Sequence, residues 1–97
     1  MYYVYILTNF TNRVLYVGVT RNLIKRVFCH KSHVVQGFSS SYNVTKLVYY
    51  EQYTDIRLAI AREKQLKRWH REWKINLITQ FNKDWSDLYD TLGVDVT

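Results

Sequence analysis

Two strand-like runs lie near the start of the chain, separated only by a short turn. Tyr2–Thr8 and residues 14–19 are rich in β-branched and aromatic side chains, and residues 8–12 have the composition of a turn. This spacing predicts an antiparallel hairpin. Both runs are almost continuously apolar, which predicts a sheet covered on both faces. Gly18 inside the second run predicts a close approach of another group to the backbone, or a bulge.

A helix is predicted to follow the hairpin, with Asn22 as its cap. Its buried stripe is expected to consist of Leu23, Ile24, Val27 and Phe28, which recur at helical spacing. A polar loop is then expected over residues 36–41.

The second half of the chain predicts one further strand and two helices. Lys46–Tyr53 has strand composition, and Thr54 or Asp55 is expected to cap a helix that begins at Ile56. The helical pattern runs to about residue 81, with a break near residues 70–71, where the apolar stripe drifts. The predicted order is β-β-α-β-α-α. The fold class is therefore α/β (α+β), a small, mainly antiparallel three-stranded sheet flanked by helices.

Length and composition limit the possible classes of protein. Ninety-seven residues make one domain, which we place at residues 1–83, followed by an acidic C-terminal tail at 84–97 that is loose at its end. No apolar run is long enough to cross a bilayer, and the N-terminus does not resemble a signal peptide. A single cysteine, Cys29, excludes an internal disulfide. We therefore expect a cytoplasmic protein without membrane contact.

Charge is distributed unevenly along the chain. All 14 Lys and Arg lie in residues 1–83 with only four acids, whereas residues 84–97 hold the other four acids and no base. A body with ten excess positive charges favours polyanions such as nucleic acid. A soluble protein that is merely basic is the alternative.

Glu63 is out of place for packing alone. On a helix that starts at Ile56, it falls in the middle of the apolar arc formed by Ile56, Ala59, Ile60 and Leu66. A carboxylate there is costly unless it is paired or binds a cation. Alternatively, the helix lies at the domain edge and Glu63 reaches water.

Arg26, His30 and His33 share one face of the first helix, because they are spaced i, i+4, i+7. Such residues could bind a phosphate and transfer protons, although an ordinary solvated polar face is the simpler interpretation. Tyr5 and Tyr16 occupy adjacent strands, where paired tyrosines usually serve packing.

Basic side chains alternate with Trp69 and Trp73 in the long helical region, a pattern that suits contact with phosphates and stacking on bases. We expect the tryptophans in the core and the basic groups at the surface. The predicted nucleic-acid contacts are Lys25, Lys64, Lys67, Arg68 and Arg71. By contrast, the chain has no zinc-ligand spacing, no glycine-rich phosphate loop, and no base close in sequence to the serines at 39–41.

Taken in order, several short motifs resemble the GIY-YIG nuclease superfamily, in its small stand-alone bacterial branch. They are Tyr3-Val4-Tyr5, Tyr16-Val17-Gly18, Thr20…Leu23…Arg26…His30, residues 41–51, Ala59, residues 62–67 and residues 69–74. The resemblance extends from Tyr3 to about Tyr89. One departure is Tyr3, which stands where the motif has Gly.

The resemblance implies a metal-dependent endonuclease that hydrolyses phosphodiester bonds, with DNA expected rather than RNA and a role in repair or recombination. It implies one Mg²⁺ or Mn²⁺ held by Glu63. Tyr5, Tyr16, Arg26 and His30 are the implied catalytic residues: Arg26 neutralises phosphate charge and Tyr16 is the general base. His30 is the alternative base. Gly18 is the motif glycine, and Asn76 lies near a position that often supports the site.

Two other functions remain open from the sequence. One is a catalytically weak or inactive nucleic-acid-binding module that uses the same basic surface. The other is a domain that acts only with a partner protein supplying specificity, docked through Trp85, Leu88 and Tyr89. Burial of those three side chains against the sheet would count against docking.

Overall fold

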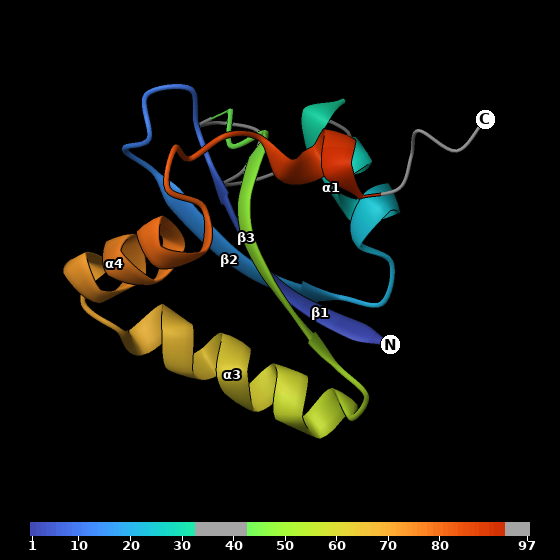
Figure 1. Cartoon of the computed structure of the whole chain (residues 1–97). Coiled ribbons are helices and arrows are strands. Elements are labelled where there is room, and N and C mark those ends of the chain that lie inside the picture. Colours follow the sequence, from blue (N-terminus) through green and yellow to red (C-terminus); the bar gives the residue numbers. More distant parts are fainter. Residues whose placement is uncertain (33–42, 93–97) are drawn as a thin grey trace.

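The protein folds as a three-stranded antiparallel sheet with helices on both faces (Figure 1). The computed structural model describes residues 1–32 and 43–92. Its elements are β1 (Tyr2–Thr8), β2 (Leu15–Thr20), α1 (Leu23–Lys31), β3 (Lys46–Tyr53), α3 (Ile56–Arg68), α4 (Arg71–Phe81) and the short 3-10 helix η1 (Leu88–Thr91). The predicted fold class and the order β-β-α-β-α-α are confirmed, with η1 as an addition.

β1 is the central strand, with β2 on one side and β3 on the other. Tyr5 in β1 lies opposite Gly18 in β2 and opposite Tyr50 in β3. The register between β1 and β3 shifts between Ile6 and Leu7, so the bulge lies in this pair rather than at Gly18.

Each face of the sheet has its own hydrophobic cluster, which confirms a sheet covered on both sides. Successive residues of β1 point to opposite faces. Val4 and Ile6 pack with α3 and α4, whereas Tyr5 and Leu7 pack with α1. The first cluster contains Val4, Ile6, Val17, Val48, Tyr49, Ala59, Leu66 and Ile78. The second contains Tyr5, Leu7, Leu23, Val27, Val44 and Leu47.

The helix starts are those that the sequence predicts. Asn22 caps α1 by accepting a hydrogen bond from the backbone N–H of Lys25 at 3.0 Å. Asp55 caps α3 by accepting from the N–H of Arg57 at 2.9 Å. Between α3 and α4, Trp69 (ψ 146°) and His70 (ψ 149°) have extended backbones, which confirms the predicted break.

The predicted buried stripe of α1 is partly wrong. Leu23 and Val27 are buried, but Ile24 is 37% and Phe28 is 56% exposed, and the third buried residue is His30 at 3% exposed. α1 has only nine residues and meets the sheet along one narrow line, which selects positions i, i+4 and i+7. His30 is therefore not on a solvated face. His33 and the loop at 36–41 lie outside the described residues.

The prediction that both tryptophans are core residues is wrong for Trp73. Trp69 is half-buried against the first cluster, whereas Trp73 is 52% exposed. The spacing of four presumes one continuous helix, but the extended residues at 69–70 change the helical phase. Across this break the two rings still meet edge to face, with centroids 5.8 Å apart.

The segment after α4 runs from the face of the sheet covered by α3 and α4 to the face covered by α1 (Figure 1). Trp85 packs against the first cluster, and Leu88, Tyr89 and Leu92 pack against the second. This half-burial counts against the predicted docking of a partner through Trp85, Leu88 and Tyr89. The last part of the predicted tail, residues 93–97, lies outside the described residues. Across residues 1–32 and 43–92, no helix combines the length and the hydropathy that a membrane span requires.

Candidate active site

Tyr5, Tyr16 and His30 meet on the α1 side of the sheet. The hydroxyl of Tyr5 lies 3.4 Å from Nε2 of His30, and their ring centroids are 6.2 Å apart. The ring of Tyr16 lies 5.2 Å from that of His30 and 6.3 Å from that of Tyr5. Three groups that can carry protons, from β1, β2 and α1, therefore share one cluster, which we name the Tyr-Tyr-His cluster.

Gly18 makes room for this cluster. A Cβ atom at Gly18 would stand 2.5 Å from both Cζ and Oη of Tyr5, far inside van der Waals contact. The two residues are cross-strand partners, so the ring of Tyr5 lies across the backbone of β2. The close approach that the sequence predicts at this glycine is confirmed, and its physical cause is the tyrosine ring.

The electrostatics of the cluster give its members different roles. Burial raises the pKa of Tyr5 well above its ordinary value, and the neighbouring Tyr16 and Glu63 act in the same direction, while Arg26 opposes them. Burial and, secondarily, the positive charge of Arg26 lower the pKa of His30. Near neutral pH, Tyr5 is therefore a neutral phenol and His30 a neutral imidazole that can accept a proton. The Nδ1 atom of His30 is buried without a hydrogen-bond partner among the described residues.

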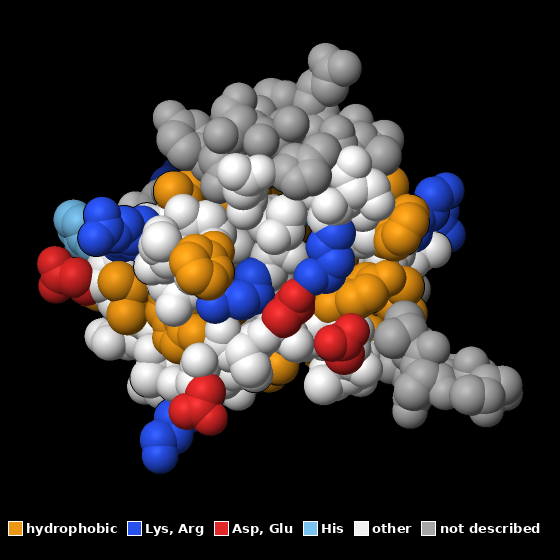
Figure 2. Space-filling view, turned by 90° about the horizontal axis from the view of Figure 1, so that it is seen from above, with side chains coloured by type: hydrophobic (Ala, Val, Ile, Leu, Met, Phe, Trp, Pro, Cys, Tyr) orange, Lys and Arg blue, Asp and Glu red, His pale blue; other side chains and the backbone are white. Residues whose placement is uncertain are grey.

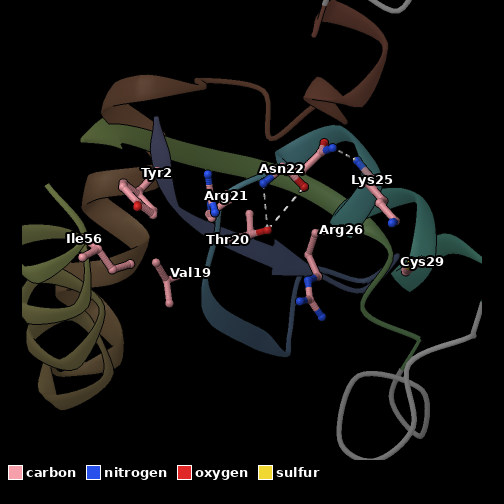
Figure 3. Close-up of a pocket in the computed structure, with 9 residues that line it drawn as sticks. All are labelled: Tyr2, Val19, Thr20, Arg21, Asn22, Lys25, Arg26, Cys29 and Ile56. Atoms are coloured by element: carbon pink, nitrogen blue, oxygen red, sulfur yellow. Dashed lines mark hydrogen bonds between the residues drawn. The ribbon is translucent and has the colours of Figure 1, made fainter. Parts of the chain in front are cut away.

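Arg26 lies beside the cluster and is exposed on α1. It lines a pocket of about 530 Å³ between the start of α1, the end of β2 and the start of α3 (Figure 3). An exposed guanidinium can make two hydrogen bonds to a phosphate. Arg26 and His30 therefore have different environments. Arg26 lines the pocket, whereas His30 is buried in the Tyr-Tyr-His cluster.

Glu63 is partly buried on α3, with 15% of its side chain exposed, and its carboxylate forms an ion pair with Nζ of Lys67 at 2.8 Å. Its helical neighbours Ile56 and Ile60 are 38% and 37% exposed, so this arc of α3 lies at the edge of the core rather than inside it. Both interpretations of Glu63 therefore apply in part. The carboxylate lies close enough to raise the pKa of Tyr5, and at the domain edge it is accessible enough to bind a cation.

The donor set around Glu63 suits one kind of metal ion. No group of three or more His, Cys, Asp and Glu side chains gathers anywhere in residues 1–32 and 43–92. A tetrahedral zinc site needs such a group, whereas Mg²⁺ is often bound by one or two carboxylates and keeps several waters. The single carboxylate of Glu63 fits the second case.

The other predicted contacts are spread over the molecule. Lys25, Lys64 and Arg68 are exposed, Lys67 is paired with Glu63, and Arg71 donates to the carbonyl of Asn12 at 3.4 Å. On the face in Figure 2, Lys and Arg side chains are dispersed among acidic and hydrophobic ones. Asn76 is exposed on α4, a helix that packs against β3, the strand at the opposite edge from β2.

Two features were missed by sequence reasoning. Arg62 is not an exposed basic group: its guanidinium binds the carboxylate of Glu51, which also accepts hydrogen bonds from Tyr49 and Tyr53. The alternation of Tyr49, Glu51 and Tyr53 along β3 is the signal that could have revealed this network, since residues spaced by two share a face. The pocket beside Arg26 was the other feature, and no local pattern indicates it.

Comparisons with known proteins identify the family and the fold of this chain. Residues 1–76 match the model of the GIY-YIG catalytic domain. The UPF0213 protein CPE1444 of Clostridium perfringens is 37% identical over 79 residues, which cover 81% of this chain and 84% of that protein. The solution NMR structure of the UPF0213 protein BH0048 from Bacillus halodurans superposes with a TM-score of 0.54 at 22% identity and covers all of both chains, which shows a shared fold.

Proposed function

This chain belongs to the GIY-YIG family, and from that premise we propose that it is a metal-dependent endonuclease that hydrolyses phosphodiester bonds, in DNA rather than RNA. One observation carries the proposal: the Tyr-Tyr-His cluster forms beside an exposed arginine and a partly buried carboxylate. Those are the groups that phosphodiester hydrolysis needs for proton transfer, for charge neutralisation and for holding a metal ion.

Proton transfer is assigned to the Tyr-Tyr-His cluster. Tyr16 is half-buried, whereas His30 is 3% exposed, so Tyr16 is the group that meets the attacking water. As Tyr16 takes the proton from water, it passes its own proton to Tyr5, which hydrogen-bonds with it, and Tyr5 passes one to Nε2 of His30. His30 is neutral before the reaction, because its pKa is lowered, and it becomes an imidazolium when it takes this proton.

Arg26 and Glu63 stabilise charge. The guanidinium of Arg26 neutralises the negative charge that builds on the phosphate in the transition state. Glu63 would hold the divalent cation, Mg²⁺ or Mn²⁺, which when bound supplies positive charge to the phosphate and the leaving oxygen.

The first test is cleavage of labelled duplex, single-stranded, flap and junction DNAs with Mg²⁺ or Mn²⁺. Glu63→Gln and Arg26→Ala are each expected to reduce metal-dependent cleavage at least about 100-fold, because each removes one charge-stabilising group. Glu72→Gln is the matched control, since Glu72 is exposed on α4. Cleavage that survives both site changes, with folding intact, would show that the site is assigned to the wrong residues.

The ion pair between Glu63 and Lys67 also favours a second candidate, a nucleic-acid-binding module without chemistry. In such a module Lys67 keeps the carboxylate occupied and no metal binds. It would give salt-sensitive binding to DNA and no products with any metal. The variant Lys67→Met distinguishes the two candidate functions. If the chain is a nuclease, the variant should bind metal ions more tightly; if it is a binding module, the variant should only bind DNA more weakly.

A further inference from the structure

The pocket beside Arg26 has two unlike walls (Figure 3). Arg21, Lys25 and Arg26 come from the turn after β2 and from α1. Tyr2, Val19 and Ile56 gather on the side toward α3. Its volume of about 530 Å³ lies within the range of pockets that bury a ligand of nucleotide size.

The basic wall suits a phosphate. Its three cations are exposed, and none of the described residues that line the pocket is acidic. The wall also includes the first turn of α1, whose N–H groups add a positive potential. Arg21 lies over the ring of Tyr2, with 5.7 Å between its Cζ and the ring centroid, so the basic wall meets the apolar wall there.

The apolar wall suits the face of a base. Ile56 is the first residue of α3 and is 38% exposed, and Tyr2 and Val19 are half-buried beside it. Phosphate contacts alone would not need such a wall, since duplex DNA presents charged backbone to a protein surface. A base within a duplex has both faces covered by its neighbours, whereas an unpaired base can stack on an apolar or aromatic side chain.

We propose that this pocket binds one unpaired nucleotide adjacent to the scissile phosphate, with its phosphate on the basic wall and its base against Tyr2, Val19 and Ile56. Arg26 lines the pocket and also belongs to the candidate active site, so the bound nucleotide lies next to the reacting phosphate. The inference rests on the proposed function for its position relative to cleavage. It makes the preferred substrate class a nucleic acid with an unpaired nucleotide at the cleavage site.

The test measures binding without divalent metal, so that it does not depend on cleavage. A labelled DNA duplex with one unpaired 2-aminopurine is compared with the same duplex fully paired, by fluorescence anisotropy in EDTA. We expect the wild-type chain to bind the first duplex about 10-fold more tightly, the contribution of one stacked base.

Two substitutions in the first turn of α3 provide the test of the pocket wall and its control. Ile56→Gln should reduce the preference for the unpaired nucleotide to less than about 3-fold, whereas Leu58→Gln, at a more exposed position of the same turn, should leave it unchanged. Val19→Thr changes the same wall from β2 with little change in volume and should also reduce the preference. Circular dichroism checks that each variant is folded.

Each outcome decides one question. Equal affinity of the wild type for both duplexes, or equal effects of Ile56→Gln and Leu58→Gln, would overturn the proposed pocket even if the chain cleaves DNA. A clear preference that Ile56→Gln removes would support the pocket even if no DNA is cleaved under any metal. In that last case the nuclease proposal fails and the nucleotide site stands.

Discussion

At the scale of single residues, the contact between Gly18 and Tyr5 decides whether the Tyr-Tyr-His cluster can form. The ring of Tyr5 is 2% exposed and lies where a Cβ atom of residue 18 would be. Because interiors are close-packed, an added methyl group must displace the ring or the strand.

Gly18→Ala is therefore expected to lower the free energy of unfolding by about 1–3 kcal/mol, the usual cost of overpacking. It should also move the hydroxyl of Tyr5 away from His30. Chemical denaturation in the wild-type and Tyr5→Leu backgrounds measures this contact directly. Gly18→Ala should lower the free energy of unfolding less in the Tyr5→Leu background, where the ring is absent. An equal loss in both backgrounds would contradict the contact.

His30 links the stability of the protein to pH. Its folded-state pKa is lowered from 6.5, chiefly by burial and also by Arg26, so the unfolded chain takes up a proton at a higher pH than the folded chain does. The contribution of neutral His30 to the free energy of unfolding is therefore fully present above pH 6.5. It is lost as the pH falls below 6.5 toward the lower pKa of the folded state.

We expect the free energy of unfolding of the wild-type chain, measured by urea denaturation, to decrease between pH 7.5 and pH 5, by at most about 1.4 kcal/mol per pH unit from this one group. His30→Gln should make that decrease smaller. His70→Gln is the matched control, because His70 is exposed and should leave the decrease unchanged. An unaltered pH dependence in His30→Gln would show that His30 does not titrate in this way.

At the scale of secondary-structure elements, Arg62 and Glu51 join α3 to β3. The guanidinium donates to the carboxylate from Nε at 3.0 Å and from Nη2 at 2.9 Å, with 21% and 18% of the two side chains exposed. Burial alone would raise the pKa of Glu51, but hydrogen bonds from Arg62, Tyr49 and Tyr53 outweigh burial and hold that pKa below its ordinary value. The network fixes the helix that carries Glu63.

Arg62→Met should destabilise the fold by about 2 kcal/mol, because it leaves a partly buried carboxylate without its cation. Arg57→Ala is the control: Arg57 also pairs with a carboxylate, Asp55, but its side chain is 87% exposed, so little change is expected. Thermal unfolding of both variants measures the difference. Similar melting temperatures for the two would contradict a structural role for the network.

At the scale of the whole molecule, Asp87 ties three separate parts of the chain together. Its carboxylate forms an ion pair with Lys31 of α1 and accepts hydrogen bonds from the backbone N–H groups of Leu47 and Tyr89, both at 3.1 Å. The segment that the sequence indicates as an acidic tail thus packs on the α1 side of the sheet, against the second hydrophobic cluster.

Asp87→Ala should lower the free energy of unfolding by about 1–2 kcal/mol, since it leaves the N–H of Leu47 without its acceptor and Lys31 without its partner. Asp84→Ala removes the same charge from an exposed position of the same segment and should have no measurable effect. Equilibrium denaturation of the two variants distinguishes a specific tie from a general effect of charge. Equal stability of both variants would show that the ion pair contributes nothing.

Local features of the sequence determined the secondary structure and part of the site. Composition and helical periodicity are properties of neighbouring residues. They identified the three strands, the cap Asn22, the cap Asp55 as one of two candidates, and the break before α4. Glu63 became a candidate because a charge within an apolar arc is visible on a helical wheel. Gly18 was found because glycine weakens a strand unless another group needs its space.

Only the tertiary structure decided which of these residues meet. His30 is buried although its helix pattern predicts solvation, because a nine-residue helix rests on the sheet along one line. The Arg62–Glu51 network, the docking of Asp87 and the two-walled pocket each join residues from elements far apart in the sequence. Such contacts depend on how helices settle against both faces of the sheet, and no periodicity within a single segment records that packing.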